Sequence, residues 1–387
     1  MLKIKFNQTN AANSSITALF NKYQHEIGFD NIVKLLHYKI YLLDQLGEYE
    51  TAVNELKNFL DNVSHLLSKE ELKLFKEKYS VYNSLRHQKK PTIFKPETDV
   101  EIPFGTLDID LTFKNKEEIL QKDTLTYGIV KVSIQEKEYI FLFDTGCEKT
   151  CIFNNISNDI NLHYLVDSIN VIGTGIVQGR GAMLDSISLG EITLCNSIIA
   201  VTDNVMKVPG AYSDKTVESI QGVFGMDFIK RLGEIQLYQH DRKIIIPQKE
   251  SELPVFGRNI MIDDNNRPII KAFNEDDLTS FLFDAGSNSN HMYKSYYLKN
   301  KDEIETKLDK GTGYSTAVGT PFSIYTSYKI PSFSLSIGET SFSLKNLDVF
   351  TERSFMEDPI ADGTLGMDFV TIQPKQIALL AFKRVRV

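Results

Sequence analysis

The sequence has no tryptophan, only three cysteines among its 387 residues, and no apolar run as long as a membrane span. A span needs about 20 consecutive apolar residues, so none is expected. Cys147, Cys151 and Cys195 are too few for a disulfide framework. Cys147 and Cys151 also lack the second Cys or His pair that would complete a zinc site, so we expect no metal and no organic cofactor.

The sequence also has no excess of basic residues over acidic ones. Lys and Arg number 43 against 51 Asp and Glu, which gives a formal net charge of −8. This balance argues against a nucleic-acid partner. The N-terminus lacks the apolar stretch of a signal peptide, which favours the cytoplasm by default. A periplasmic or secreted protein stays open if a leader segment has been removed.

The first part of the chain has helical spacing. Hydrophobic residues make up 42% of the sequence, and from about residue 12 to 90 they recur three and four positions apart. Gly47 interrupts this spacing, and the segment from Gly47 to Ala52 resembles the turn of a tetratricopeptide repeat. We predict a helical domain over residues 1–92. Two interpretations of it stay open: a surface that docks a protein partner, and a small bundle that packs on the rest of the chain.

The pattern changes after Pro91. Short runs such as Leu107–Phe113 and Ile129–Ile134 alternate apolar and polar residues, and Gly, Asn, Asp and Ser separate them. Many short strands with turns are typical of β-sandwiches and β-barrels, so we predict an all-β region that reaches the C-terminus.

This β region contains an internal repeat. Phe141–Gly146 reads Phe-Leu-Phe-Asp-Thr-Gly, and Phe281–Gly286 reads Phe-Leu-Phe-Asp-Ala-Gly at a spacing of 140 residues. Three further pairs recur in the same order: Glu101–Gly105 with Glu252–Gly257, Gly173–Gly175 with Gly311–Gly313, and Val223–Phe228 with Thr364–Phe369. Four ordered matches predict a duplicated domain, with lobes at residues 93–248 and 249–387. The first lobe has a longer interval before its Asp, which predicts an insertion around 114–123.

Two equivalent lobes can bring two carboxyl groups together. Carboxyl groups a few ångströms apart cannot both ionise, so one proton is shared. The ionised member can act as a general base toward water and the protonated member as a general acid toward a carbonyl oxygen. Gly beside each Asp allows the sharp turn.

Hydrophobic-hydrophobic-Asp-Thr-Gly, followed by a hydrophobic-hydrophobic-Gly element, resembles the signature of pepsin and retropepsin-like aspartic proteases. The resemblance covers Glu101 to the end of the chain and implies two fused retropepsin-like β-barrel lobes in a bilobal, mainly β fold. It implies that Asp144 and Asp284 are the catalytic pair. The supporting residues it implies are Thr145, Gly146, Ala285 and Gly286 in the catalytic loops, Gly225 and Gly366 as packing glycines, and Gly173, Gly175, Gly311, Gly313 and Tyr314 as flap candidates.

Ala285 departs from that signature, since the family usually has Thr or Ser there. Alanine cannot donate a hydrogen bond across the lobe interface. We therefore carry two hypotheses: a monomeric aspartic endopeptidase that hydrolyses a peptide or protein substrate, and a catalytically impaired module that binds a peptide or protein. A third possibility is a self-blocked state, with the helical segment or the loop Asn204–Gln221 in the cleft.

Overall fold

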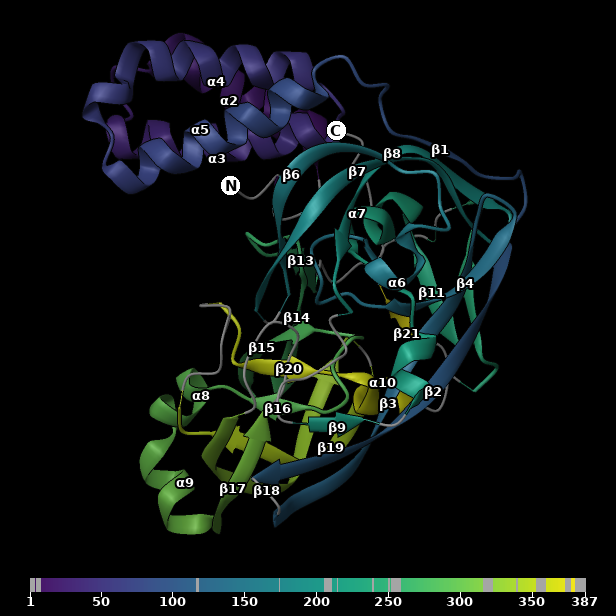
Figure 1. Ribbon diagram of the computed structural model, residues 1–387. Coiled ribbons are helices and arrows are strands. Elements are labelled where there is room, and N and C mark those ends of the chain that lie inside the picture. Colours follow the sequence, from purple (N-terminus) through teal and green to yellow (C-terminus); the bar gives the residue numbers. More distant parts are fainter. Residues whose placement is uncertain are drawn as a thin grey trace.

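The computed structural model describes residues 4, 8–115, 118–173, 175–204, 211–213, 215–238, 240–249, 251, 259–315, 323–338, 340–352, 360–372 and 377–379. Within these ranges, a helical part precedes two β-rich lobes that lie side by side (Figure 1). The fold is mainly β with a small helical domain, which confirms the predicted fold class. The boundaries at residues 92 and 248 stay a prediction, and the repeat element at 252–257 lies outside the described residues.

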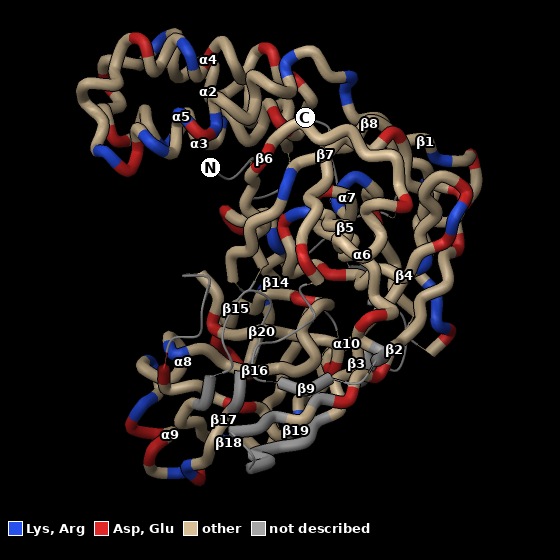
Figure 2. The backbone as a smooth tube through the Cα atoms, viewed as in Figure 1, with Lys and Arg blue, Asp and Glu red and all other residues tan. Residues whose placement is uncertain are grey.

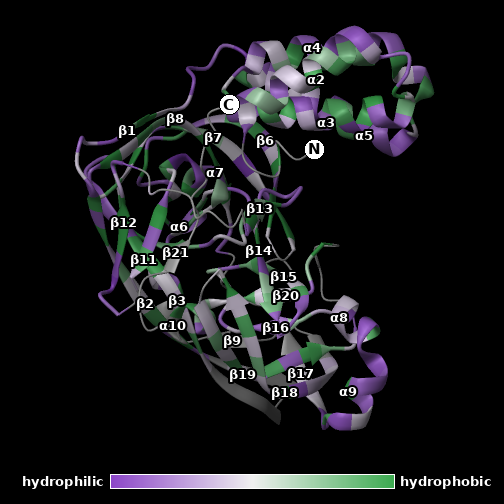
Figure 3. Cartoon of the chain, turned by 180° about the vertical axis from the view of Figure 1, so that it is seen from behind, coloured by the Kyte–Doolittle hydropathy of each residue, from purple (hydrophilic) through white to green (hydrophobic). Residues whose placement is uncertain are grey.

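The helical part is built from amphipathic helices around a small core. Hydrophobic and hydrophilic residues are interspersed along α3 and α5 (Figure 3), and Ile40, Leu56 and Phe75 are fully buried between the helices. The elements are α2 (Thr9–Tyr23), α3 (Phe29–Gln45), α4 (Tyr49–Val63), the 3₁₀ turn η1 (Ser64–Leu66) and α5 (Lys69–Leu85).

Local chemistry sets the ends of these helices. Gly47 has a φ of 64° in the turn between α3 and α4, a backbone conformation that glycine adopts without strain. Ser68 caps α5: its hydroxyl accepts the Glu71 N–H at 3.2 Å, and the Glu71 carboxylate accepts the Ser68 N–H at 2.9 Å. The predicted helices and the Gly47 turn are confirmed, whereas the likeness to a tetratricopeptide repeat stays a prediction.

The first lobe is one large sheet with short helices at its loops. Its elements are β1 (Thr92–Phe94), β2 (Val100–Asn115), β3 (Glu118–Ile134), β4 (Lys137–Phe143), β5 (Cys151–Phe153), α6 (Asn154–Ser157), β6 (His163–Ile172), β7 (Ile176–Leu189), β8 (Ile192–Thr202), β9 (Ala211–Ser213), η2 (Lys215–Ser219), β10 (Gly222–Phe224), α7 (Met226–Ile229), η3 (Lys230–Leu232), β11 (Ile235–Tyr238) and β12 (Lys243–Ile246).

The second lobe follows the same plan. Its elements are β13 (Ile260–Ile262), β14 (Pro268–Asn274), β15 (Asp277–Phe283), β16 (His291–Met292), α8 (Lys294–Lys299), α9 (Lys301–Lys307), β17 (Lys310–Ser315), β18 (Ser323–Ile337), β19 (Thr340–Phe350), β20 (Gly363–Leu365), α10 (Met367–Ile372) and β21 (Ile377–Leu379). In lobe one β4 pairs in parallel with β10, and in lobe two β15 pairs in parallel with β20. A strand pair ending in Asp-Xaa-Gly is thus built twice.

Three strands tie the lobes together. The β2–β3 hairpin of the first lobe reaches the second lobe (Figure 1), where β3 contacts α10 and the backbone N–H of Thr126 in β3 donates to Asn288 Oδ1 at 2.7 Å. Within the predicted insertion around 114–123, Lys114 and Asn115 of β2 pair with Ile119 and Glu118 of β3. In return, β21 pairs with β11 of the first sheet. One hydrophobic core, which includes Phe141 and Phe281, runs through both lobes.

The surface carries both signs of charge. Lys and Glu or Asp alternate along α5 and α9 (Figure 2). No helix within the described ranges has both the length and the apolar content needed to cross a bilayer.

The two predicted packing glycines lie in close contact with the loops that follow the aspartates. A Cβ on Gly225 would meet the backbone carbonyl oxygen of Lys149 at 2.6 Å, and one on Gly366 would meet that of Ser287 at 2.6 Å. The loop after each Asp therefore rests directly on a glycine of the later element. Any side chain there would have to displace backbone.

Gly225→Ala is expected to lower the free energy of unfolding by about 1–3 kcal/mol, because the rigid backbone at Lys149 cannot move away as a side chain could. Gly311→Ala is the matched control, since its Cβ would meet nothing closer than 3.9 Å. Urea denaturation of both variants measures the difference. Equal stability of the two variants would show that the close approach at Gly225 is unimportant.

Candidate active site

The two aspartates occupy equivalent places at the ends of buried strands. Asp144 follows β4, and its backbone N–H donates to the carbonyl oxygen of Phe224 at 3.1 Å. Asp284 follows β15, and its N–H donates to the carbonyl oxygen of Leu365 at 2.9 Å. The paired strand thus fixes where each chain turns, and the turn places each carboxyl group at the lobe interface.

Each carboxylate is held by its own loop in the same way. Asp144 Oδ1 accepts the N–H groups of Gly146 and Cys147 at 2.8 and 3.1 Å. Asp284 Oδ1 accepts those of Gly286 and Ser287 at 2.9 and 3.1 Å. Backbone donors of this kind stabilise the ionised form of a carboxyl group.

The structure brings the two carboxyl groups into contact. A Cβ on Gly146 would lie 2.3 Å from Asp284 Cγ, and a Cβ on Gly286 would lie 2.4 Å from Asp144 Cγ. The two carboxyl groups are close enough for each to shift the pKa of the other. Each Asp therefore packs against the glycine of the opposite loop, and only glycine leaves room for it.

The environment of the pair favours one shared proton. Burial raises the pKa of Asp144 well above its ordinary value, and the negative charge of Asp284 raises it further. Burial also raises the pKa of Asp284, while the hydrogen bond from Asp144 and the cation of Arg267 oppose that rise. The pair therefore holds one proton between its two carboxyl groups, and Arg267 favours the arrangement in which Asp284 is the ionised member.

Thr145 joins the two loops across the interface. Its hydroxyl donates to the carbonyl oxygen of Phe283 at 2.8 Å and accepts the N–H of Ala285 at 2.9 Å. Thr145 and Ala285 are both fully buried. The predicted cross-lobe bond of Thr145 is present, and Ala285 has no hydroxyl with which to return it.

The flap candidates lie on two hairpins that differ between the lobes. Gly173 and Gly175 form the turn between β6 and β7, where the Gly173 N–H donates to the Gly175 carbonyl oxygen at 2.9 Å. The carbonyl oxygen of Ile172 accepts the N–H of Glu148 at 2.8 Å, which ties this turn to the loop after Asp144.

In the second lobe the corresponding glycines are not in a turn. Gly311, Gly313 and Tyr314 lie within β17 and pair with β18. Residues 316–322, which connect the two strands, are outside the described residues, as is most of the segment 205–214 within the loop Asn204–Gln221. Whether either hairpin acts as a flap stays a prediction.

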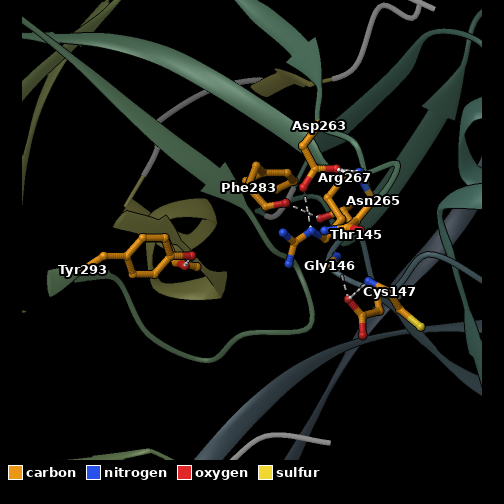
Figure 4. Close-up of polar contacts among 10 residues, drawn as sticks. Thr145, Gly146, Cys147, Asp263, Asn265, Arg267, Phe283 and Tyr293 are labelled. Carbon is orange, nitrogen blue, oxygen red and sulfur yellow. Dashed lines mark hydrogen bonds and ion pairs between the residues drawn. The ribbon is translucent and has the colours of Figure 1, made fainter. Parts of the chain in front are cut away.

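A buried ion pair that the sequence does not predict lies beside the site. Arg267 Nε donates to Asp263 Oδ2 at 2.8 Å, and both side chains are nearly inaccessible to solvent. Figure 4 shows Arg267 reaching past Asp263 toward the Thr145–Gly146 loop. The only signal in the sequence is a turn-forming Asp-Asp-Asn-Asn segment before Arg267, and such a segment does not indicate burial. In the described part of the chain, no group of three or more His, Cys, Asp or Glu is arranged to hold a metal ion.

Thr145→Val is expected to destabilise the protein by about 1–3 kcal/mol, because it leaves the buried Phe283 carbonyl and Ala285 N–H without their partner at nearly unchanged volume. Ala285→Ser is the reciprocal variant, and a second cross-lobe bond should raise stability by about 1 kcal/mol. Thermal unfolding at neutral pH measures both. A neutral Thr145→Val would contradict the importance of this contact.

Comparison with known proteins agrees with this geometry. The model of a family described as aspartyl protease matches residues 130–228, which include Asp144 and Gly225. No curated protein matches the sequence. Solved structures with partial similarity include the basic 7S globulin from soybean (10% identity, 72% of this chain and 93% of that one, TM-score 0.38) and conglutin gamma from lupine seeds (7% identity, 68% and 90%, TM-score 0.35). These two likenesses are too weak to bear on activity. The family match and the paired Asp loops together show a chain with an aspartyl-protease-like fold.

Proposed function

We propose that the chain is an aspartic-type endopeptidase that hydrolyses peptide bonds with a water molecule activated by Asp144 and Asp284. One observation carries the proposal: the loops of the two lobes interlock, so that the Asp284 carboxyl group packs against Gly146 and the Asp144 carboxyl group packs against Gly286. Two carboxyl groups this close, and largely removed from water, cannot both ionise at little cost. The family match over residues 130–228 supports the same reaction class.

The roles follow from the two pKa shifts. Ionised Asp284 takes a proton from water as the water oxygen attacks the carbonyl carbon of the peptide bond. Protonated Asp144 gives its proton to the carbonyl oxygen, which yields a tetrahedral diol. When the carbon–nitrogen bond of the diol breaks, the leaving amine takes the proton of Asp284, Asp144 takes a proton from one diol hydroxyl, and the carboxylic acid product forms with both aspartates back in their starting states. Buried N–H donors from Gly146 and Gly286 hold both carboxyl groups in place throughout.

Ala285 favours a second candidate function, a module that binds a peptide without cleaving it. The missing hydroxyl leaves the interface with the Thr145 bonds alone. A protein partner for the helices and a monomeric state also remain proposals, motivated by the Gly47 turn and by the fusion of both lobes in one chain.

Asp144→Asn and Asp284→Asn are each expected to reduce cleavage of a mixed peptide library by at least about 100-fold, because each removes an acid–base group. Mass spectrometry of the digested library measures the loss. Asp302→Asn, on the exposed surface of α9, is the matched control and should cleave normally. Undiminished cleavage by either site variant contradicts the proposal. If the unmodified protein binds peptides without cleaving them, the result favours the binding module.

The same Asn variants should be at least as stable as the unmodified protein at neutral pH. The raised pKa of Asp144 means that the folded state keeps this proton at pH values where the unfolded state has lost it. Stability therefore falls as pH rises through that window, and a neutral Asn removes the loss. This expectation separates a loss of chemistry from a loss of folding.

Cleavage is expected to follow a bell-shaped pH profile. Activity falls at low pH when Asp284 takes up a proton, and at high pH when Asp144 loses its proton. Because burial and the charge of Asp284 raise the pKa of Asp144, the alkaline limb should lie well above the value of about 3.9 for an exposed aspartate. Measuring kcat/KM on one cleaved peptide from acid to neutral pH checks this, and an alkaline limb near that ordinary value contradicts it.

A further inference from the structure

One residue from each of the three parts of the chain meets the other two in a buried triangle. Lys230, in η3 of the first lobe, donates from Nζ to Tyr41 Oη of α3 at 2.9 Å and to Asn266 Oδ1 of the second lobe at 2.9 Å. Tyr41 Oη itself donates to Asn266 Oδ1 at 2.7 Å. We call these three residues the three-way contact.

The three-way contact is costly to build. Lys230 is 7% exposed and Asn266 2% exposed, and the two hydrogen-bond partners of the Lys230 ammonium are neutral. Burial lowers the pKa of Lys230 to about 7, and the charge of Arg231 lowers it further. A buried ammonium without a bonded carboxylate does little for stability. The contact instead fixes how the three parts of the chain are oriented, because its three hydrogen bonds are directional.

Asn266 connects this contact with the pair of aspartates, Asp144 and Asp284. It lies in the tight turn 263–267, where it has a φ of 65°. Within this turn, Asp263 Oδ1 accepts the Arg267 N–H at 2.6 Å, and the two side chains form the buried ion pair. Arg267 directly precedes β14, and β14 pairs with β15, whose last residue precedes Asp284. The positive charge of Arg267 lowers the pKa of Asp284.

Besides the three-way contact, α3 makes one more hydrogen bond to the turn 263–267, and its charge affects the residues after Asp144. Tyr38 of α3 donates to Asp264 Oδ1 at 3.2 Å, which adds a second bond to the turn 263–267. In the first lobe, burial lowers the pKa of Lys149. The negative charges of Glu148 and Asp44 raise it by more, so the net shift is upward. Asp44 belongs to α3, and Glu148 and Lys149 follow Asp144 closely in sequence. The helical domain is therefore bonded to the turn 263–267, and the charge of its Asp44 affects the residues that follow Asp144.

We propose that Tyr41, Lys230 and Asn266 are positioning residues of the active site, through which the docked helical domain fixes the turn 263–267 and holds Arg267 beside Asp284. This inference rests on the proposed function for its kinetic consequence only. It assigns the helical domain a role in the reaction geometry, whether or not the helices also bind a partner.

Two variants loosen the contact without disturbing the backbone. Tyr41→Phe removes only the hydroxyl, and Asn266→Gly removes only the amide, since glycine tolerates a positive φ. Their matched controls are Tyr23→Phe, on an exposed tyrosine of α2, and Asn346→Gly, at an exposed asparagine with a φ of 51°. All four are compared with the unmodified full chain.

The first readout needs no activity. Hydrogen exchange of the Gly286 and Ser287 amides, which donate to Asp284, should be faster in both contact variants than in both controls. The second readout is kinetic. We expect kcat to fall roughly 10- to 100-fold with KM nearly unchanged. The acid limb of the profile should move to higher pH, because a displaced Arg267 no longer favours the ionised form of Asp284 beside Asp144.

The outcomes separate the two proposals. If the unmodified protein cleaves no peptide, the proposed function fails, and the exchange measurement alone still decides the positioning role. If the contact variants match their controls in exchange and in the acid limb, the positioning role is wrong even where cleavage is normal. A lower melting temperature with unchanged exchange and acid limb would identify the contact as merely structural, which also overturns the proposal.

Discussion

The enforced contact between Asp144 and Asp284 is the constraint on which the rest of the structure depends. Two carboxyl groups taken out of water beside each other repel when both are charged, so the fold must hold them together against that repulsion. Four backbone N–H donors, two in each loop, do so. The glycines at 146 and 286 leave the space, and the hydroxyl of Thr145 joins the loops. The N–H donors, the glycines and the Thr145 hydroxyl are local features, but they hold the two carboxyl groups together only when both lobes are docked.

Docking of the lobes is therefore part of the chemistry. A shared core, the β2–β3 hairpin and the pairing of β21 with β11 fix the lobes broadly. The three-way contact adds directional bonds at one edge, at the cost of burying the ammonium of Lys230. If the lobes were not docked, Asp144 and Asp284 would no longer lie together. The stability lost by burying Lys230 is therefore offset by a better-defined geometry at the two aspartates. The helical domain is thus joined to the reacting groups.

The aspartates, their glycines and Thr145 could be predicted from sequence because the motif is short, local and repeated 140 residues later. The Gly47 turn and the strands were predictable because glycine turns and alternating apolar residues are local signals. Lys230, Asn266 and Arg267 were not, since their positions depend on contacts between segments far apart in the chain. Gly311 and Gly313 show the limit of repeat reasoning: they align with Gly173 and Gly175, yet they lie inside a strand rather than in a turn.

The most direct test of the account is a titration of the two carboxyl groups by carbon-13 NMR of labelled aspartate, with each resonance assigned from the Asn variants. The account predicts two coupled transitions, with the pKa of Asp144 well above that of an exposed aspartate and lowered when Asp284 is replaced. Two independent transitions near the ordinary value of about 3.9 would contradict a shared proton, and with it the proposed chemistry.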